Sequence, residues 1–262
     1  MDDLRLAAAA ARTGGAIVRA AFGSPAQMRK KGKFDPVTEV DHRAEKAIVE
    51  VIRSHRPDDG ILAEEGGGVS APGRHWIIDP MDGTVNFLHG IPQVSVSIAC
   101  YDGEEALAGV VYDPLREELF AARAGGNATL NGASISVSET SELMDAVVAT
   151  GFPYDHDRYA EEYTAVVSAV LREVNGIRRL GSAALDLAWT AAGRYEGYWE
   201  LGLAPWDHAA GALVVRAAGG IVTDPFGTAT TPTSRLLVAG NDALQAALLA
   251  IVRTAMPDRL VP

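Results

Sequence analysis

The chain has 262 residues, of which 48% are hydrophobic, and it carries a formal net charge of −11 at pH 7. This length and composition can fill a sizeable core in one large domain or two smaller ones, which argues against a disordered chain. The negative charge argues against a surface that binds nucleic acid, although an anionic small substrate can bind where metal cations offset the local field.

The N-terminal segment predicts a helix over residues 3–22, because its apolar residues recur at helical spacing. Asp2 and Asp3 precede the first arginine, so the order of charges is the reverse of that in a signal peptide. No stretch of the sequence reaches the roughly 18 uninterrupted apolar residues of a membrane helix. We therefore expect a soluble, cytoplasmic protein that makes no membrane contact.

Residues 30–41, KKGKFDPVTEVD, predict a polar loop, and a second helix is expected to begin near Thr38. Two short apolar runs follow, GILAEE and HWIID, and each ends in carboxylates. Residues 94–131 then predict an antiparallel meander of strands separated by turn residues. The single cysteine, Cys100, lies in this region, and we expect it to be a packed core thiol rather than a nucleophile.

Beyond residue 140 the pattern changes to helices that alternate with short apolar runs such as GYWEL, GIVTD and LLVAG. The helices are predicted over residues 158–173, 182–192, 206–218 and 241–254. This rhythm is typical of an α/β fold. We expect a domain boundary near residue 140, with an N-terminal α+β domain (1–140) that carries metal-binding motifs and a C-terminal α/β domain (141–262) that completes the active site.

Acidic residues stand at the ends of several predicted elements, and each one alone is typical of a solvated surface acid. Together they are better explained by strand ends, where open sheets bind their ligands. Converging carboxylates would repel one another and raise one another's pKa unless cations lay between them. Ligation by oxygen alone favours Mg²⁺ over Mn²⁺ or Ca²⁺. The residues concerned are Asp41, Glu64, Glu65, Asp79, Asp82 and Asp207.

The segment from Asp79 to Thr84, DPMDGT, holds two of these carboxylates at a fixed offset. Its proline fixes one φ angle, and Gly83 allows a sharp turn next to the acids. The carbonyl of Met81 is left free to join as a ligand. Backbone N–H groups of Gly83 and Thr84, together with the threonine hydroxyl, suit a phosphate group.

This combination predicts metal-assisted hydrolysis of a phosphate ester, in which paired cations about 3.5 to 4 Å apart stabilise the attacking and leaving oxygens. Other chemistries lack their usual motifs. The sequence contains no GxxxxGK[ST] phosphate-binding loop and no GxSxG nucleophile elbow. His208 adjoins Asp207, and we expect it to be a helix-surface or packed histidine rather than part of the site.

Residues 79–87, DPMDGTVNF, and residues 206–211, WDHAAG, resemble the two signature motifs of the inositol monophosphatase family of Mg²⁺-dependent, Li⁺-sensitive phosphatases. The resemblance extends from about residue 35 to residue 225 and includes DPVTEVD, LAEEGG, GIRRLGSAALDLAWTAAGRYEGYWE and AAGGIVTD. It implies the layered αβαβα sugar-phosphatase fold, usually assembled as a homodimer.

The resemblance also implies ligands for two or three Mg²⁺ ions, for which Mn²⁺ can substitute. Glu64, Asp79 and the Met81 carbonyl would hold the first ion. Asp79, Asp82 and Asp207 would hold the second, and Glu64 would help to place a weaker third ion.

By the same resemblance, Thr84, hydrogen-bonded towards Asp41, would orient the nucleophilic water together with Glu64. The substrate would be bound by residues near these ligands and by residues of the second half of the chain. The implied substrate-binding residues are Asp82, Gly83, Thr84, Gly181, Ser182, Ala183, Glu200 and Asp207.

Two groups of basic residues leave alternatives open. Lys31 and Lys33 occupy the position of a mobile segment near the family's active site, but a solvated basic turn is equally plausible. Arg178 and Arg179 precede the implied substrate-binding glycine and could favour an additional anionic group or pair at a subunit interface.

Members of this family hydrolyse inositol monophosphates, histidinol phosphate, fructose bisphosphate or nucleotide-derived phosphates. Asn86 and Phe87 resemble the inositol monophosphatase branch, and the Glu200 carboxylate can accept hydrogen bonds from a polyol. We therefore expect hydrolysis of inositol monophosphate to myo-inositol and phosphate. Histidinol phosphate is the second expectation, because a carboxylate also suits its ammonium group. A non-enzymatic role as an RNA-processing or transcription-associated partner is the alternative from another class.

Overall fold

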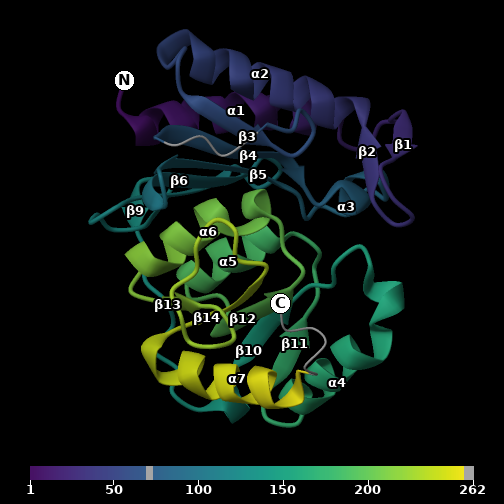
Figure 1. Cartoon of the computed structure of the whole chain (residues 1–262), viewed down its shortest axis with the longest axis vertical. Coiled ribbons are helices and arrows are strands. Elements are labelled where there is room, and N and C mark those ends of the chain that lie inside the picture. Colours follow the sequence, from purple (N-terminus) through teal and green to yellow (C-terminus); the bar gives the residue numbers. More distant parts are fainter. Residues whose placement is uncertain (69–72, 257–262) are drawn as a thin grey trace.

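The computed structural model, which describes residues 1–68 and 73–256, contains five layers in the order helix, sheet, helix, sheet, helix (Figure 1). This confirms the αβαβα fold expected from the sequence. Helices α1 (Asp3–Ala21) and α2 (Glu39–His55) cover the outer face of a seven-stranded sheet, and α5 (Ala183–Ala191) and α6 (Pro205–Ala217) lie between the two sheets. Helices α4 (Ala160–Leu171) and α7 (Asp242–Ala255) cover the outer face of a five-stranded sheet.

Each of these helices lies within two residues of its predicted bounds. Helices α1, α2, α4 and α7 bury one apolar face, whereas α5 and α6 are buried nearly all round because they lie between the two sheets. The first two helices also approach each other closely. A Cβ atom on Gly14 of α1 would lie only 2.6 Å from the Cδ1 atom of Ile48 of α2. Glycine at this position therefore allows α1 and α2 to form one compact layer.

The seven-stranded sheet begins with β3 (Gly60–Ala63), which pairs in parallel with β4 (Arg74–Asp82). The remaining strands form the predicted antiparallel meander in chain order, which confirms that expectation. They are β5 (Ser95–Asp102), β6 (Glu105–Asp113), β7 (Glu118–Arg123), β8 (Thr129–Leu130) and β9 (Ala133–Ser134).

Both faces of this sheet are covered, so its central strands are apolar almost throughout. Trp76 and Ile78 of β4 pack towards α1 and α2, whereas Ile77 between them packs towards the middle helices. Cys100 is buried on the outer side, and burial raises the pKa of its thiol to about 12. The expectation of a packed core thiol is therefore confirmed.

The five-stranded sheet has the order β11 (Gly176–Arg178), β10 (Val147–Thr150), β12 (Gly197–Leu201), β14 (Leu236–Gly240) and β13 (Ile221–Thr223). Strand β10 is parallel to both of its neighbours, and β14 is antiparallel to both of its own. Residue 140 lies in the segment between the two sheets. Because α5 and α6 also contact β5 and β6, the two halves share one core, and their division into domains at residue 140 stays a prediction.

The structure differs from the sequence predictions in two places near the site. The predicted polar loop contains a small antiparallel sheet of β1 (Met28–Lys30) and β2 (Pro36–Thr38), joined by residues 31–35. Strand β1 is exposed along its length, so no apolar alternation marks it. A short helix, α3 (Thr84–Leu88), follows β4, and single 3₁₀ turns occur at Leu143–Asp145 and His156–Arg158. Within the described residues, no helix has the length and apolar character to cross a membrane.

Candidate active site

Two parallel strand ends bring the first pair of acids together. Because Ala63 of β3 lies beside Ile78 of β4, the next residues, Glu64 and Asp79, emerge at the same edge of the sheet. The backbone N–H of Glu64 donates to the carbonyl of Ile78 at 3.1 Å, which extends the pairing by one step. Residues that are 15 positions apart in the sequence thus meet at one point.

A bulge in β4 sets the offset between Asp79 and Asp82. The register with β5 shifts between these two residues, and β4 then resumes pairing at Asp82 opposite Ser95. The strand therefore continues beyond the acid at which the apolar run ends. The backbone N–H of Met81 donates to Oδ1 of Asp79 at 2.9 Å, which fixes that carboxylate within the bulge.

Asp82 connects the first sheet to the middle helices. Its Oδ2 atom accepts hydrogen bonds from the Ser182 hydroxyl at 2.6 Å, the Ala184 backbone N–H at 2.9 Å and the Ser95 hydroxyl at 3.3 Å. Ser182 is the N-cap of α5. The predicted substrate-side residue Ser182 therefore also orients a predicted metal ligand.

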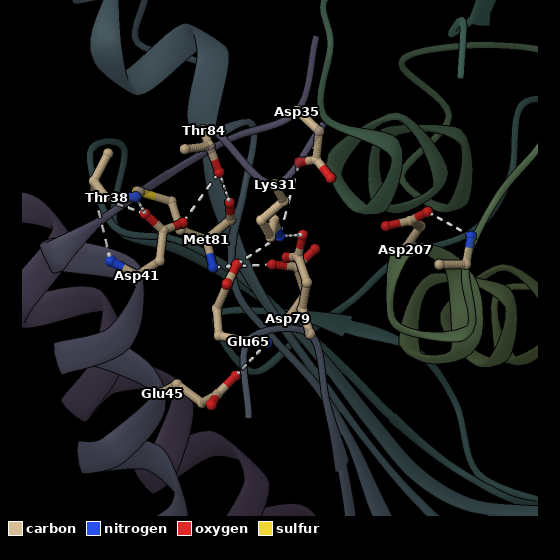
Figure 2. A network of polar contacts seen from close by, with 12 residues as sticks. Lys31, Asp35, Thr38, Asp41, Glu45, Glu65, Asp79, Met81, Thr84 and Asp207 are labelled. Carbon is tan, nitrogen blue, oxygen red and sulfur yellow. Dashed lines mark hydrogen bonds and ion pairs between the residues drawn. The ribbon is translucent and has the colours of Figure 1, made fainter. Parts of the chain in front are cut away.

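Asp207 arrives from the second half of the chain, in the first turn of α6. Its Oδ2 atom accepts a hydrogen bond from the Ala204 backbone N–H at 2.7 Å, and its carboxylate lies across from Asp79 and Lys31 (Figure 2). The next residue, His208, is buried, and burial lowers its pKa to about 4. His208 is thus a packed histidine, as expected.

Thr84 and Asp41 form the hydrogen bond that the resemblance implies. The Thr84 hydroxyl lies 3.1 Å from Oδ1 of Asp41 and 3.1 Å from the Met81 carbonyl oxygen (Figure 2). Asp41 is held by the capping box of α2, in which its Oδ2 atom accepts from the Thr38 backbone N–H at 2.8 Å and from the Thr38 hydroxyl at 2.6 Å.

Gly83 makes the turn that presents Thr84. Its φ angle is +100°, and a Cβ atom there would lie 2.7 Å from the backbone oxygen of Gln93. Hydrogen bonds of the Asn86 side chain fix the following turn. Its Nδ2 group donates to the carbonyl oxygens of Gln93 and Leu180 at 2.8 Å each. Asn86 therefore ties α3 to the segment that precedes α5.

Lys31, in the tip that joins β1 and β2, extends into the acidic cluster (Figure 2). Its Nζ atom lies 2.7 Å from Oε1 of Glu64 and 2.8 Å from Oε1 of Glu65. Burial lowers the pKa of Lys31, but the two carboxylates outweigh burial and leave that pKa raised. Lys31 is therefore a residue of the site, whereas Lys33 is exposed and pairs with Asp157.

The acids of the site carry an electrostatic cost that cations would relieve. Burial raises the pKa of Glu64 to about 7, against the lowering effect of Lys31. Burial, followed by the charges of Glu64, Asp82 and Asp207, raises the pKa of Asp79 well above its ordinary value. The pKa of Asp207 is also raised, chiefly by burial. Such a group of buried and half-buried carboxylate oxygens fits a hard divalent cation by its chemistry.

Two adjoining cavities meet over these residues. The acidic cavity is lined by residues that include Lys31, Glu64, Asp79 and Met81. The second cavity is lined mainly by the second half of the chain. Its lining includes Phe152, Arg179, Gly181, Ser182, Ala183 and Glu200. Asp82, Gly83, Thr84, Tyr154, Gly202 and Asp207 line both cavities.

Glu200 and Arg179 give the second cavity its polar character. Oε2 of Glu200 accepts a hydrogen bond from the Tyr198 hydroxyl at 2.5 Å, and burial raises the pKa of Glu200 to about 7. The Arg179 guanidinium lies 5.6 Å from the centre of the Phe152 ring. The sequence left two arginines open: both are exposed, and Arg179 lines this cavity whereas Arg178 does not.

Comparison of the sequence with known proteins identifies the family of this chain. The sequence matches the model of the inositol monophosphatase family over residues 2–256. The chain belongs to the inositol monophosphatase family. It is 42% identical to the Nus factor SuhB of Escherichia coli K12 over 261 residues, which cover 98% of each chain. It is also 42% identical to an inositol-1-monophosphatase of Mesorhizobium japonicum over 235 residues, which cover 89% of this chain and 88% of that protein.

Solved structures of the family agree with the fold. The extragenic suppressor protein suhB of Bartonella henselae superposes with a TM-score of 0.91 at 40% identity, over 95% of this chain and 97% of that one. An inositol monophosphatase of Thermotoga maritima gives a TM-score of 0.90 at 36% identity, over 97% and 98% of the two chains. Metal-dependent phosphatase chemistry is the common property of the family.

The family's metal chemistry agrees with the oxygen-rich lining of the acidic cavity, but the side chains are not arranged as a closed cage. Within residues 1–68 and 73–256, no group of three or more His, Cys, Asp and Glu side chains already converges as metal ligands do. Asp82 and Asp207 each direct one oxygen to protein donors instead. Binding of a cation would therefore require these side chains to turn towards Asp79 and Glu64.

Tyr154 lines both cavities, but the sequence analysis did not identify it as a site residue. Its signal was weak, since the segment GFPYDHD contains no acid spacing or motif that resembles a site. Its position directly beyond the C-terminal end of β10 is the feature that could have indicated it, because loops at strand ends often bind ligands.

Proposed function

We propose that this protein is a Mg²⁺-dependent phosphomonoesterase that hydrolyses inositol monophosphate to myo-inositol and phosphate. The observation that carries the proposal is the position of Thr84, whose hydroxyl contacts Asp41 at the border between an acidic cavity and a polar cavity. One cavity suits cations and a phosphate group, and the other suits a hydroxylated leaving group.

In this proposal Glu64, Asp79 and the Met81 carbonyl hold one Mg²⁺, and Asp79, Asp82 and Asp207 hold a second, while Glu64 helps to place a weaker third ion. When bound, these cations would activate water and offset the charge of the phosphate. Mn²⁺ would substitute for Mg²⁺, and Li⁺ would inhibit.

The residues of the chain then position the reactants. Thr84 donates its hydroxyl proton to Asp41, so the lone pairs of Oγ1 can accept a hydrogen bond from the attacking water. Glu64, at the neighbouring parallel strand end, would border the same water and could accept its proton. The backbone N–H groups of Gly83 and Thr84 bind the phosphate oxygens, because they lie where the turn opens into α3.

The substrate's ring would occupy the second cavity. Glu200 would accept hydrogen bonds from its hydroxyls, and Gly181, Ser182 and Ala183 would line the same side. The same carboxylate would also suit the ammonium group of histidinol phosphate. A kinetic panel of inositol 1-phosphate, histidinol phosphate and fructose 1,6-bisphosphate in Mg²⁺ would rank these substrates.

The decisive experiment measures phosphate release by the wild-type protein and by Asp79→Asn and Asp207→Asn. We expect Mg²⁺-dependent release that EDTA abolishes and that both variants lose by about 100-fold or more. Asp102→Asn is the matched control, since Asp102 is exposed at the opposite end of the same sheet, where β5 lies beside the start of β4 at Arg74. Unchanged release in both site variants would contradict the two-metal proposal.

One comparison favours a second candidate function. The Escherichia coli relative is named a Nus factor, and the alignment covers 98% of both chains. We propose that a transcription-associated role would act through protein contacts, because the net charge of −11 opposes direct RNA binding. Asp79→Asn separates the two functions: it should abolish phosphate release and leave such an association intact.

The family resemblance also supports a homodimer. Light scattering on the wild-type protein tests this assembly: a mass near twice 27.6 kDa is the expected result. A mass that stays at the value of one chain at all concentrations would contradict it.

A further inference from the structure

Tyr154 occupies the border between the two cavities. It lies in the segment between β10 and α4 and lines the acidic cavity together with Glu64 and Asp79, and the polar cavity together with Glu200. Its side chain is half-exposed, with 48% of its surface accessible. Among the described residues, the Tyr154 hydroxyl has no hydrogen-bond partner. A donor at this border is therefore available to a bound molecule.

Contacts with the other half of the chain hold the segment around Tyr154 in place. The ring of His156 stacks on Phe34 with 4.7 Å between ring centres and an angle of 27° between planes. Asp157 accepts a hydrogen bond from Lys33 at 2.6 Å. The segment is thereby attached to the tip of the β1–β2 hairpin, which also carries Lys31 into the site.

The ordinary pKa of a tyrosine hydroxyl is about 10, so the Tyr154 hydroxyl keeps its proton at neutral pH. A neutral phenol is a hydrogen-bond donor, and a donor is the complement of an oxygen that gains negative charge.

We propose that Tyr154 is a catalytic residue that donates a hydrogen bond to the ester oxygen between the phosphate and the polyol of the substrate. This inference rests on the proposed phosphatase function. With the phosphate at Gly83 and Thr84 and the polyol at Glu200, the ester oxygen falls at the border that Tyr154 lines.

The proposed contact becomes stronger as the reaction proceeds. Water attacks phosphorus, the bond from phosphorus to the ester oxygen breaks, and the electron pair of that bond remains on the leaving oxygen. The product alcohol takes its proton from solvent water, so Tyr154 keeps its own proton. A hydrogen bond that strengthens as charge develops raises kcat more than it lowers KM.

The test compares Tyr154→Phe with the wild-type protein on two substrates in Mg²⁺. Inositol 1-phosphate has an alcohol leaving group that needs stabilisation, whereas p-nitrophenyl phosphate has a phenolate leaving group that needs little. We expect kcat for inositol 1-phosphate to fall about tenfold or more with little change in KM, and kcat for p-nitrophenyl phosphate to fall less than about threefold.

Tyr159→Phe is the matched control, because it removes a hydroxyl from the same segment. Tyr159 packs edge-on against Tyr163 at 6.3 Å and lines neither cavity. Equal rates in Tyr154→Phe and wild type, or equal losses on both substrates, would overturn the role of Tyr154. A wild-type protein that releases no phosphate from either substrate would instead refute the proposed function on which this role rests.

Discussion

At the residue scale, the position of the Thr84 hydroxyl depends on a buried carboxylate that belongs to a helix cap. Asp41 accepts hydrogen bonds from Thr38 through Oδ2 and faces Thr84 through Oδ1. The same side chain therefore stabilises the start of α2 and orients a group of the site. Burial raises the pKa of Asp41 against the effect of these hydrogen bonds.

Removing the hydroxyl of Thr84 should stop catalysis without unfolding the protein. Thr84→Val keeps the shape of the side chain but cannot orient water, so we expect kcat to fall by about 100-fold or more. Thr84→Ser keeps the hydroxyl and should lose less than about tenfold. Steady-state kinetics in Mg²⁺ measure both, and equal activities in the two variants would contradict the role of the hydroxyl.

Glu200 should make stability depend on pH in the metal-free protein. A carboxyl whose pKa is raised on folding favours the folded state below its unfolded pKa, and this contribution is lost as pH rises through the folded pKa. For Glu200 that window runs from 4.5 to about 7. Wild type should therefore lose about 2 kcal/mol relative to Glu200→Gln between about pH 5.5 and about pH 8.

Urea unfolding in EDTA at the two pH values measures this difference. Glutamine keeps an acceptor for the Tyr198 hydroxyl, so the comparison isolates the charge. A difference between the two proteins that does not change with pH would show that Glu200 titrates normally.

At the element scale, the sequence predicted the parts whose local pattern matches their environment. The helices follow the spacing of buried residues such as Ile48 and Ile52, and the motif DPMDGT marks the strand end from which two acids project. The β1–β2 hairpin was not predictable in this way, because its exposed first strand carries no pattern. Tyr154 was not predictable either. Its neighbours His156 and Asp157 contact Phe34 and Lys33, which lie more than 120 positions earlier in the sequence.

The hairpin tip should be held by its stacking contact with the segment 152–158. Phe34→Ala removes the ring that stacks on His156, so the tip should open more often and be cut faster by trypsin at Lys30, Lys31 or Lys33. Loss of an aromatic contact of this kind should raise the population of the open tip, and therefore the cleavage rate of Phe34→Ala relative to wild type, by about 2- to 10-fold. Met28→Ala, an exposed change on the same hairpin, is the control, and equal cleavage of both variants would contradict the contact's role.

At the scale of the whole molecule, the site exists only because two halves of the chain share one core. Glu64, Asp79 and Asp82 come from the seven-stranded sheet, whereas Asp207 and Glu200 come from the helices and sheet of the second half. Helix α6 carries Asp207 against the seven-stranded sheet, and β12 supplies Glu200, which lines the second cavity together with Asp82. Burial of these acids raises their pKa values, and a bound cation would offset that cost and stabilise the folded protein.

The central claim is that these acids together hold divalent cations, and calorimetric titration of Mg²⁺ or Mn²⁺ into the metal-free protein tests it most directly. Wild type and Asp102→Asn should bind the cation with the same affinity. Asp79→Asn and Asp207→Asn should each bind it at least about tenfold more weakly, although the two residues come from opposite halves of the chain. Binding to both site variants with wild-type affinity would contradict the account.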